Sequence, residues 1–356
     1  MKDRIAALRE AAEIREGRAV LVTKPSNVFY LSGFTGEGAL LLTLFSQTII
    51  TDSRYTEQAE KQAAGFRVEM TLKGVSRNSI VYRMLKNEGC TELLYEDDEY
   101  TVRAFNAMQQ EMPGFSFLSL SNVPEKLRTR KDEGEISLIS EACDISCQAF
   151  DWLLGEIKPG MTEKTSRMLL ENRMLELGAD RIAFNTIVAS GENGSLPHAV
   201  PGERAFCTGD MITFDFGAKK GGYCADMTRT VALGQPGEKM KHIYSVVLQA
   251  QKECEQALAP GKSCREIDSL AREIIYGAGY EGFFGHGLGH GVGIDIHEEP
   301  RLSQTSDALL EEGHIVTVEP GIYVPGFGGV RIENTCLITA SRARTLVHAQ
   351  KDLVIL

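Results

Sequence analysis

Two symmetric pairs of carboxylates constrain this sequence more than any other feature. Asp215 and Asp226 flank one glycine-rich segment, and Glu319 and Glu333 flank a second one centred on Gly326. In an antiparallel hairpin, residues equidistant from the turn face each other, with Cβ atoms roughly 5 Å apart. We therefore expect two hairpins in which the carboxylates lie directly opposite each other. Like charges in that position destabilise a sheet, so two such pairs call for a bound cation.

The residues around the first pair support this expectation. Pairing Asp215 with Asp226 places the centre of the turn between Lys220 and Gly221. Residues 211–216 alternate between apolar and polar side chains, and Asp215 belongs to the polar set. Alternation with a period of two puts such a set on one face of a sheet. Solvent-facing strand carboxylates are the alternative, but the same symmetry in two hairpins favours a dinuclear metal site.

A segment rich in histidine and glycine, residues 285–293, is the second unusual feature. It contains His286 and His290, and His297 follows shortly after it. Alternating glycines make a helix unfavourable here, so the backbone must approach a neighbour closely or adopt positive φ. One of the three histidines is expected to complete a metal shell, and the others to contact substrate. The odd spacing of His290 and His297 allows them to share a pocket only if the glycines bend the chain.

The order of predicted elements divides the chain into two parts. Residues 1–122 have the pattern of an α/β domain, and a polar stretch at 121–126 is typical of a linker. Residues 123–356 repeat one order twice: helix, Pro-Gly, helix, hairpin, with the Pro-Gly pairs at 159–160 and 260–261. This repeat predicts two halves related by a pseudo-twofold axis. The order is not β-α-β throughout, so we expect an α+β arrangement rather than a Rossmann sheet.

Composition excludes several classes of function. The net charge of −11, without a basic patch, argues against a nucleic-acid partner. The longest apolar run, residues 38–45, is too short to span a bilayer, and residues 1–4 lack a signal-peptide core. We therefore expect no membrane partner and a cytoplasmic location. Eight cysteines without a C-x-x-C pair are typical of reduced structural thiols, and they argue against a thiolate metal site.

At these residues the chain resembles the creatinase/methionine aminopeptidase superfamily, the pita-bread metallopeptidases. The resemblance covers most of the chain, and it implies an α+β pita-bread catalytic domain after a smaller α/β creatinase-like N-terminal domain. By resemblance Asp215 binds one ion, whereas Asp226 and Glu333 bridge two. His290 and Glu319 complete the shell of the second ion. The family uses two divalent ions, most commonly Mn²⁺ in this branch, with Co²⁺ or Zn²⁺ in relatives.

The motifs in residues 29–36 and 51–55 resemble the N-terminal domain of the proline-specific branch, aminopeptidase P and prolidase. This branch implies an exopeptidase for substrates with proline in the second position, working as a homodimer. Glu319 is then the residue that handles the proton. His198 and His297 position the substrate and stabilise the oxyanion. By the same resemblance, His286 and Arg331 also bind substrate.

Several alternatives remain open at this level. Aminopeptidase P is the first expectation, but the motifs do not separate it from prolidase, which cleaves only Xaa-Pro dipeptides. The N-terminal domain disfavours methionine aminopeptidase, and creatinase lacks this metal set. A non-catalytic pita-bread module is disfavoured because all five ligand positions are filled. Arg331 either orients Glu333, binds substrate, or is a plain charge partner of the acidic cluster.

Overall fold

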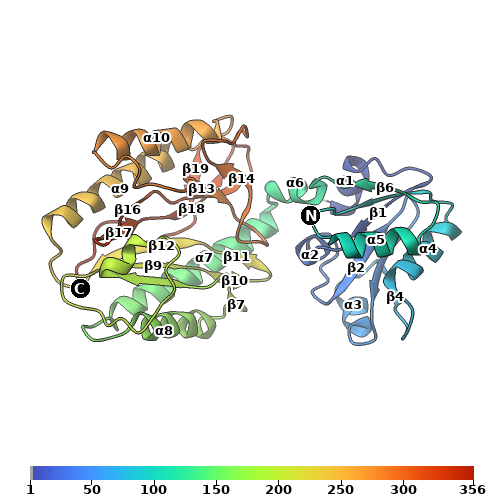
Figure 1. Cartoon of the computed structure of the whole chain (residues 1–356), viewed down its shortest axis with the longest axis horizontal. Helices are drawn as coiled ribbons and strands as arrows, with labels where there is room; N and C mark the ends of the chain where they lie inside the picture. Colours follow the sequence, from blue (N-terminus) through green and yellow to red (C-terminus); the bar gives the residue numbers. More distant parts are fainter. Residues whose placement is uncertain (1–2) are drawn as a thin grey trace. The chain divides into compact units, whose positions relative to one another are not determined.

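The computed structural model describes residues 3–356, which form two compact units that divide between Arg128 and Thr129 (Figure 1). Each unit is built from both helices and strands, in agreement with the predicted fold class. In the described part of the chain, no helix combines the length and apolar character that a bilayer span requires.

The first unit is a mixed six-stranded sheet with helices between its strands. The sheet order is β4-β3-β2-β1-β5-β6, with β2 antiparallel to both neighbours and the outer pairs parallel. Strands β1, β2 and β3 are buried at four of their five positions, as expected for their apolar runs. The elements are α1 (Arg4–Ala11), β1 (Arg18–Val22), α2 (Pro25–Ser32), β2 (Gly38–Leu42), β3 (Gln47–Thr51), α3 (Thr56–Gln62), β4 (Arg67–Met70), α4 (Arg77–Asn87), β5 (Glu92–Tyr95), α5 (Val102–Glu111), β6 (Ser116–Ser119) and α6 (Val123–Thr129).

The stretch at 121–126 is not an extended linker, which corrects the sequence prediction. Ser121 and Asn122 have positive φ and end the last strand of the sheet, and helix α6 follows immediately. The hydroxyl of Tyr30 donates to the carbonyl of Leu127, and the Arg128 guanidinium donates to Asn27. The helix is thus fixed within the first unit.

The second unit contains two helix pairs and a set of antiparallel strands. Thr162 and Ser263 cap α8 and α10 by accepting from the backbone of Thr165 and Glu266, as their positions after the Pro-Gly pairs predict. Figure 1 shows the α7–α8 and α9–α10 pairs flanking the strands from two sides. The helices are α7 (Glu133–Leu154), α8 (Glu163–Glu176), α9 (Glu238–Ala257) and α10 (Cys264–Gly277), with a 3-10 turn η1 at Gly191–Ser195.

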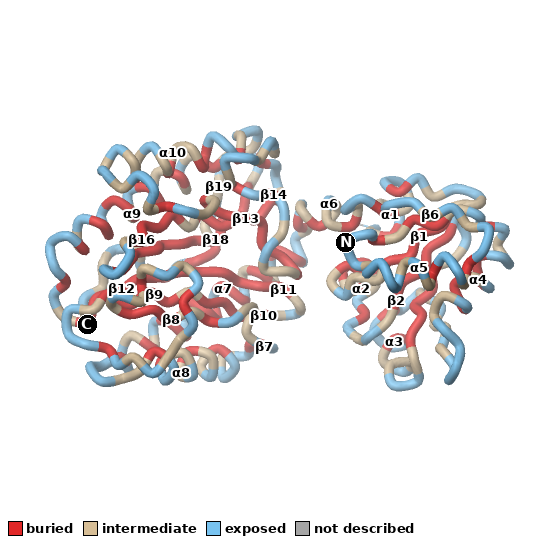
Figure 2. Tube along the Cα trace, in the orientation of Figure 1, coloured by how far each residue is buried: buried red, intermediate tan, exposed pale blue. Residues whose placement is uncertain are grey.

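The strands of this unit form four small sheets with the orders β11-β10-β7, β12-β9-β8, β14-β13-β15-β18-β19 and β16-β17. Figure 2 shows that the buried residues concentrate along these strands. The strands are β7 (Arg181–Ile182), β8 (Ile187–Ser190), β9 (Met211–Phe216), β10 (Ala218–Lys220), β11 (Tyr223–Cys224), β12 (Met227–Ala232), β13 (Gly289–Gly291), β14 (Glu298–Leu302), β15 (Ile315–Val318), β16 (Gly321–Val324), β17 (Gly328–Arg331), β18 (Asn334–Ile338) and β19 (Ala343–Thr345).

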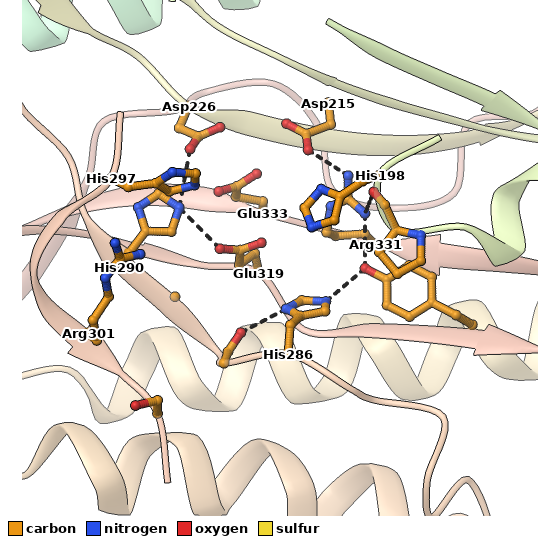
Figure 3. Close-up of a pocket in the computed structure, with 15 residues that line it drawn as sticks. His198, Asp215, Asp226, His286, His290, His297, Arg301, Glu319, Arg331 and Glu333 are labelled. Carbon is orange, nitrogen blue, oxygen red and sulfur yellow. Dashed lines mark hydrogen bonds and ion pairs between the residues drawn. The ribbon is translucent and has the colours of Figure 1, made fainter. Parts of the chain in front are cut away.

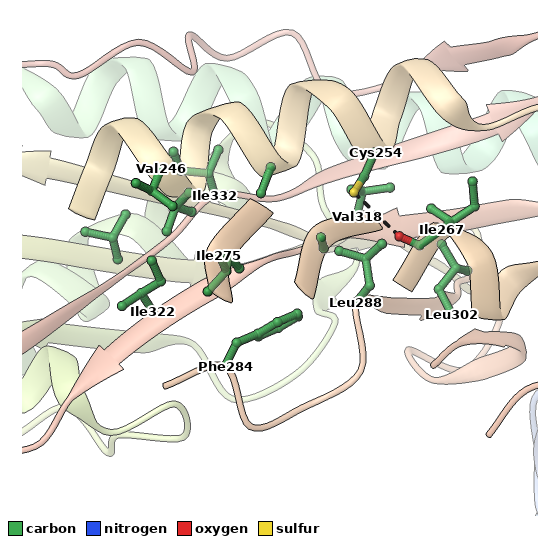
Figure 4. Close-up of a cluster of buried hydrophobic side chains, with 14 of the residues drawn as sticks. Val246, Cys254, Ile267, Ile275, Phe284, Leu288, Leu302, Val318, Ile322 and Ile332 are labelled. Carbon is green, nitrogen blue, oxygen red and sulfur yellow. Dashed lines mark hydrogen bonds between the residues drawn. The ribbon is translucent and has the colours of Figure 1, made fainter. Parts of the chain in front are cut away.

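One apolar core supports the second half of the repeat. Figure 4 shows side chains of α9 and α10 packed against the strands that follow them. Ile267 and Ile275 from α10 and Ile322 from β16 belong to this cluster, and all three are buried. Truncating one such side chain to alanine typically costs about 2–5 kcal/mol. The core therefore fixes the strands whose other face carries the polar site.

A buried histidine makes the stability of this unit depend on pH. Nδ1 of His314 accepts from the backbone N–H of Glu311 at 3.1 Å. Burial, followed by the charges of Lys131 and Arg130, lowers the pKa of His314 to about 4, whereas the pKa in an unfolded chain is about 6.5. Between these values the unfolded chain binds a proton that the folded chain does not. Stability is therefore lost as the pH falls from about 6.5 towards 4.

We predict that His314→Asn loses less stability between pH 7 and pH 5 than the wild type does, because asparagine accepts the same hydrogen bond without titrating. Urea unfolding followed by circular dichroism at both pH values measures the difference. His348→Asn, at an exposed histidine, is the control and should lose as much as the wild type. Equal losses in all three proteins would contradict the assignment.

Candidate metal centre

The first carboxylate hairpin has a different register from the one that the sequence predicted. Gly221 and Gly222 both have positive φ, 56° and 87°, so they form a two-residue turn whose centre lies between them. Asp215 therefore pairs with Thr228 instead of Asp226. The predicted direct opposition of the two aspartates is wrong, because the turn is centred one position later. Asp226 lies between β11 and β12, and the charge of Asp215 still acts on it.

The second hairpin has the register that its symmetry predicts. Val318 pairs with Asn334 on one side, and Gly321 pairs with Arg331 on the other. Continuing the same register places Glu319 opposite Glu333. Both carboxylates lie between regular strands, where β15 passes into β16 and β17 passes into β18.

The glycines of the histidine segment allow strands to approach closely. A Cβ on Gly289 would lie 2.0 Å from the carbonyl oxygen of Thr317, and one on Gly291 would lie 2.2 Å from that of Glu299. His290 sits between these glycines on β13, and its backbone N–H donates to the Thr317 hydroxyl at 3.0 Å. Beyond β13 the chain bends back, so that the rings of His290 and His297 lie 4.5 Å apart, edge to face. The condition for the two histidines to share a pocket is therefore met.

All nine site residues predicted from the sequence line one cavity of about 420 Å³. In Figure 3 the four carboxylates converge on a common space, with His290 and His297 on one side and His198 and Arg331 on the other. The predicted residues are His198, Asp215, Asp226, His286, His290, His297, Glu319, Arg331 and Glu333. Their individual roles stay predictions.

The cavity also includes residues that the sequence reasoning missed, among them Tyr323 and Arg301. Tyr323 lies on β16, in the same hairpin as the second carboxylate pair. Its position two residues from Gly321 does not indicate a site residue, because a tyrosine in an apolar strand usually belongs to the hydrophobic core. Arg301 follows His297 by four residues in the sequence, and this proximity was a usable signal.

Arg331 is fixed by a network of short hydrogen bonds. Its Nη2 donates to Oδ2 of Asp215 at 2.6 Å, and its Nη1 donates to the Tyr323 hydroxyl at 2.9 Å. That hydroxyl lies 2.9 Å from Nε2 of His286. The Nδ1 of His286 faces the Gly287 carbonyl, which only accepts, so Nδ1 carries the proton and Nε2 accepts from the tyrosine. Arg331 thus contacts Asp215 directly, and its hydrogen-bond path to Glu333 runs through the Thr228 hydroxyl.

The donor set fits a divalent cation. Ligand atoms of Asp226, His290 and Glu333 all lie within 4.8 Å of one another. Oδ1 of Asp215 and Oε1 of Glu333 are buried without a hydrogen-bond partner among the described residues. Orphaned buried oxygens of this kind are costly unless an ion satisfies them. Nδ1 of His290 donates to the Gly291 carbonyl, and this tautomer leaves a lone pair on Nε2.

The electrostatics of the carboxylates agree with this fit. Burial raises the pKa of Asp226 well above its usual range, and the charge of Glu333 adds to the effect. Burial and then Glu319 do the same to the pKa of Glu333. Burial also acts to raise the pKa of Glu319, but His290 and His286 outweigh it and lower that pKa to about 2. Without a cation, a proton is therefore harder to remove from Asp226 and Glu333 than from exposed carboxyl groups.

The sequence matches two family models. A model of metallopeptidase family M24 matches residues 137–340, and a model of the creatinase/prolidase N-terminal domain matches residues 4–130. An Xaa-Pro dipeptidase from Pyrococcus furiosus is 36% identical over 356 residues, covering 99% of this chain and 100% of the relative.

Two solved structures are also similar over nearly the whole chain. An Xaa-Pro dipeptidase from Bacillus anthracis has 40% identity and a TM-score of 0.95, with 99% of both chains covered. An X-Pro aminopeptidase from Thermotoga maritima has 34% identity and a TM-score of 0.90, covering 98% of this chain and 100% of that one.

We predict that metal binding releases protons and weakens as the pH falls, because Asp226 and Glu333 must lose a proton to bind. Calorimetric titration of metal-free protein with Mn²⁺, in two buffers of different ionisation enthalpy near pH 6, measures the release. Asp226→Asn should reduce both the number of bound ions and the protons released. Asp151→Asn, at an exposed position of α7, should change neither. Equal affinity at pH 6 and pH 8 without proton release would refute the coupling.

Proposed function

The chain belongs to metallopeptidase family M24, with a creatinase/prolidase-type N-terminal domain, and on this basis we propose that it hydrolyses the Xaa-Pro bond of dipeptides. Two of the similar proteins reported above carry the name Xaa-Pro dipeptidase. The observation that carries the proposal is the convergence of four carboxylates, four histidines and two arginines on a single cavity. Aminopeptidase activity on longer peptides is the second candidate, because the relative from Thermotoga maritima has that name.

Arg301 is the observation that favours dipeptides. It lies on β14 at the wall of the cavity, and its charge acts on His297. Its side chain is 44% exposed, and in the part of the chain that the structure describes it pairs only with Glu299, at 4.0 Å. A partly exposed guanidinium without a close ion-pair partner can bind a planar carboxylate through two parallel hydrogen bonds. The C-terminal carboxylate of a dipeptide lies one residue beyond the scissile bond, whereas a longer peptide has an amide there.

The metal centre of this proposal contains two divalent ions, with Mn²⁺ as the first choice. Four carboxylates and one imidazole form a set of mostly hard oxygen donors, which suits Mn²⁺. Asp215 would bind one ion, Asp226 and Glu333 would be shared, and His290 and Glu319 would complete the second. When bound, such ions polarise the scissile carbonyl and make a water acidic enough to attack near neutral pH.

The surrounding side chains hold the substrate and move the proton. Burial, followed by the charges of His290 and Arg301, lowers the pKa of His297 to about 4, so its ring is neutral at pH 7 and donates through one N–H. His198 and His297 would donate to the carbonyl oxygen as negative charge develops on it. Glu319 would accept the proton of the attacking water and pass it to the proline nitrogen.

The hydrogen bonds of Arg331 hold Asp215 in one orientation, so we assign Arg331 a positioning role. His286 supports it through the Tyr323 hydroxyl. We also propose that the first unit is the N-terminal domain and the second unit the catalytic domain. Their boundary is then at residues 128–129 instead of 122–123, because helix α6 is held by the first unit. A homodimer and a cytoplasmic location are part of the same proposal.

Assays with a Met-Pro dipeptide and a Met-Pro-Xaa peptide test the substrate class. We predict that the dipeptide is cleaved preferentially and that Arg301→Met raises its KM roughly 10- to 100-fold, since a hydrogen bond to a charged group contributes about 1.5–3 kcal/mol. Hydrolysis of the longer peptide should not respond to this substitution. Arg342→Met, at an exposed position, is the control. Faster cleavage of the longer peptide, with no effect of Arg301→Met, would establish an aminopeptidase instead.

The two neighbouring histidines should respond differently to substitution. His297→Ala should keep both ions and lose about 10²- to 10³-fold in turnover, the usual effect of removing one oxyanion donor. His290→Ala should lose metal as well as turnover. Bound metal, measured by mass spectrometry, and kcat on Met-Pro distinguish the two. A metal-depleted His297→Ala protein would show that the roles have been interchanged.

A further inference from the structure

The loop that follows β13 determines where the imidazole of His297 lies. This histidine loop, residues 291–298, doubles back and places His297 against His290 (Figure 3). Among the described residues, the ring of His297 has no hydrogen-bond partner of its own, unlike the rings of His286 and His290. The position of that ring therefore depends on the backbone of the loop.

The carboxylate of Glu298 closes the histidine loop. Its Oε1 accepts from the backbone N–H of Asp295 at 3.1 Å, and the N–H of Gly293 donates to the Asp295 carbonyl at 3.1 Å. Gly293 leaves space for this arrangement, because a Cβ there would lie 2.5–2.7 Å from the carboxylate atoms of Glu298. The residue next to His297 thus folds the loop onto itself.

A lysine from outside the loop holds that carboxylate. Nζ of Lys131 lies 3.1 Å from Oε2 of Glu298, and the two side chains are only 1% and 7% exposed. Lys131 directly precedes Asp132, the N-cap of α7, and its backbone N–H donates to the Gly313 carbonyl at 2.8 Å. The cation is therefore fixed at the start of a 22-residue helix. Burying such a pair has a large desolvation cost, so it is weak evidence for a purely stabilising role.

The first carboxylate hairpin holds the middle of the same loop. Nζ of Lys219 donates to the Ile294 carbonyl. The backbone N–H of Cys224 donates to the Gly293 carbonyl at 2.8 Å. These contacts place the loop directly against the hairpin that carries Asp226.

We propose that Glu298, held by its buried ion pair with Lys131, is a positioning residue that fixes the histidine loop and thereby the imidazole of His297 beside the metal centre. The inference rests on the proposed function, in which His297 contacts the reacting carbonyl. In this proposal the ion pair affects turnover, whereas an ion pair that only stabilises the fold would not.

The test uses full-length, Mn²⁺-loaded protein in which both charges are removed, Lys131→Met with Glu298→Gln. Neutralising both partners removes the two charges of the buried pair together, so the variant is expected to fold. Its kcat on Met-Pro should fall about 10- to 100-fold, as for other groups that orient a site residue, with bound metal and KM unchanged. Adding His297→Ala should leave kcat close to that of His297→Ala alone, because both changes act through one imidazole.

Hydrogen–deuterium exchange provides a readout that needs no turnover. Exchange in residues 291–298 should be faster in the neutral-pair variant than in the wild type, whereas α10 should be unchanged. The matched control is Lys241→Met with Glu238→Gln, which removes an exposed Lys–Glu pair of 2.8 Å on α9. It should alter neither kcat nor exchange.

Three outcomes would overturn the inference. The neutral-pair variant could keep both the kcat and the exchange rates of the wild type, or it could lose bound metal. In the third outcome, the fold-loss in kcat of the variant that also carries His297→Ala equals the product of the two separate losses. A wild-type protein that leaves Xaa-Pro dipeptides intact would instead contradict the proposed function, and the exchange comparison would still test the loop.

Discussion

Mutual repulsion among buried carboxylates is the constraint on which the rest of this structure depends. Asp226 and Glu333 are almost completely buried; burial raises the pKa of both, the charge of Glu333 adds to the effect on Asp226, and the charge of Glu319 adds to the effect on Glu333. A protein tolerates such a group only if cations or protons offset the charge. The chain supplies part of the offset itself through Arg331, which pairs with Asp215. The remaining buried oxygens match the divalent ions that this metallopeptidase family requires.

A second buried arginine shows how far the backbone is arranged around this charge. Arg229 is 1% exposed and donates to the main-chain carbonyls of Glu333, Ala349 and Gln350. It has no carboxylate as a direct partner in these bonds. Its contacts therefore fix the backbone at Glu333 without competing for the oxygens of that side chain.

The sequence predicted much of this, and its failures have physical reasons. Symmetry about Gly326 gave the correct register for Glu319 and Glu333, because that loop is centred on a single residue. The same argument failed for Asp215, because the two central turn residues were Gly221 and Gly222, and alternation alone does not locate a turn centre.

Side-chain networks were harder to predict than the carboxylates and histidines. Tyr323 was missed because its partners, His286 and Arg331, come from distant strands that only the fold brings together. The composition of residues 121–126 is typical of a linker, because local composition does not show what a segment packs against. The glycines permit the bend that brings His297 to His290, but the sequence alone does not determine whether the chain takes it.

The orphaned oxygens of Asp215 and Glu333 link folding to the supply of metal. Ions that bind the native centre and not the unfolded chain raise the free energy of unfolding. The increase grows with the logarithm of the ion concentration and is about 2.7 kcal/mol at one hundred times Kd. The ligands come from positions as far apart as Asp215 and Glu333, so this contribution exists only when the whole second unit is assembled. Scarcity of metal would therefore reduce both the amount of folded protein and the catalytic rate of each folded molecule. Abundance and activity would fall together.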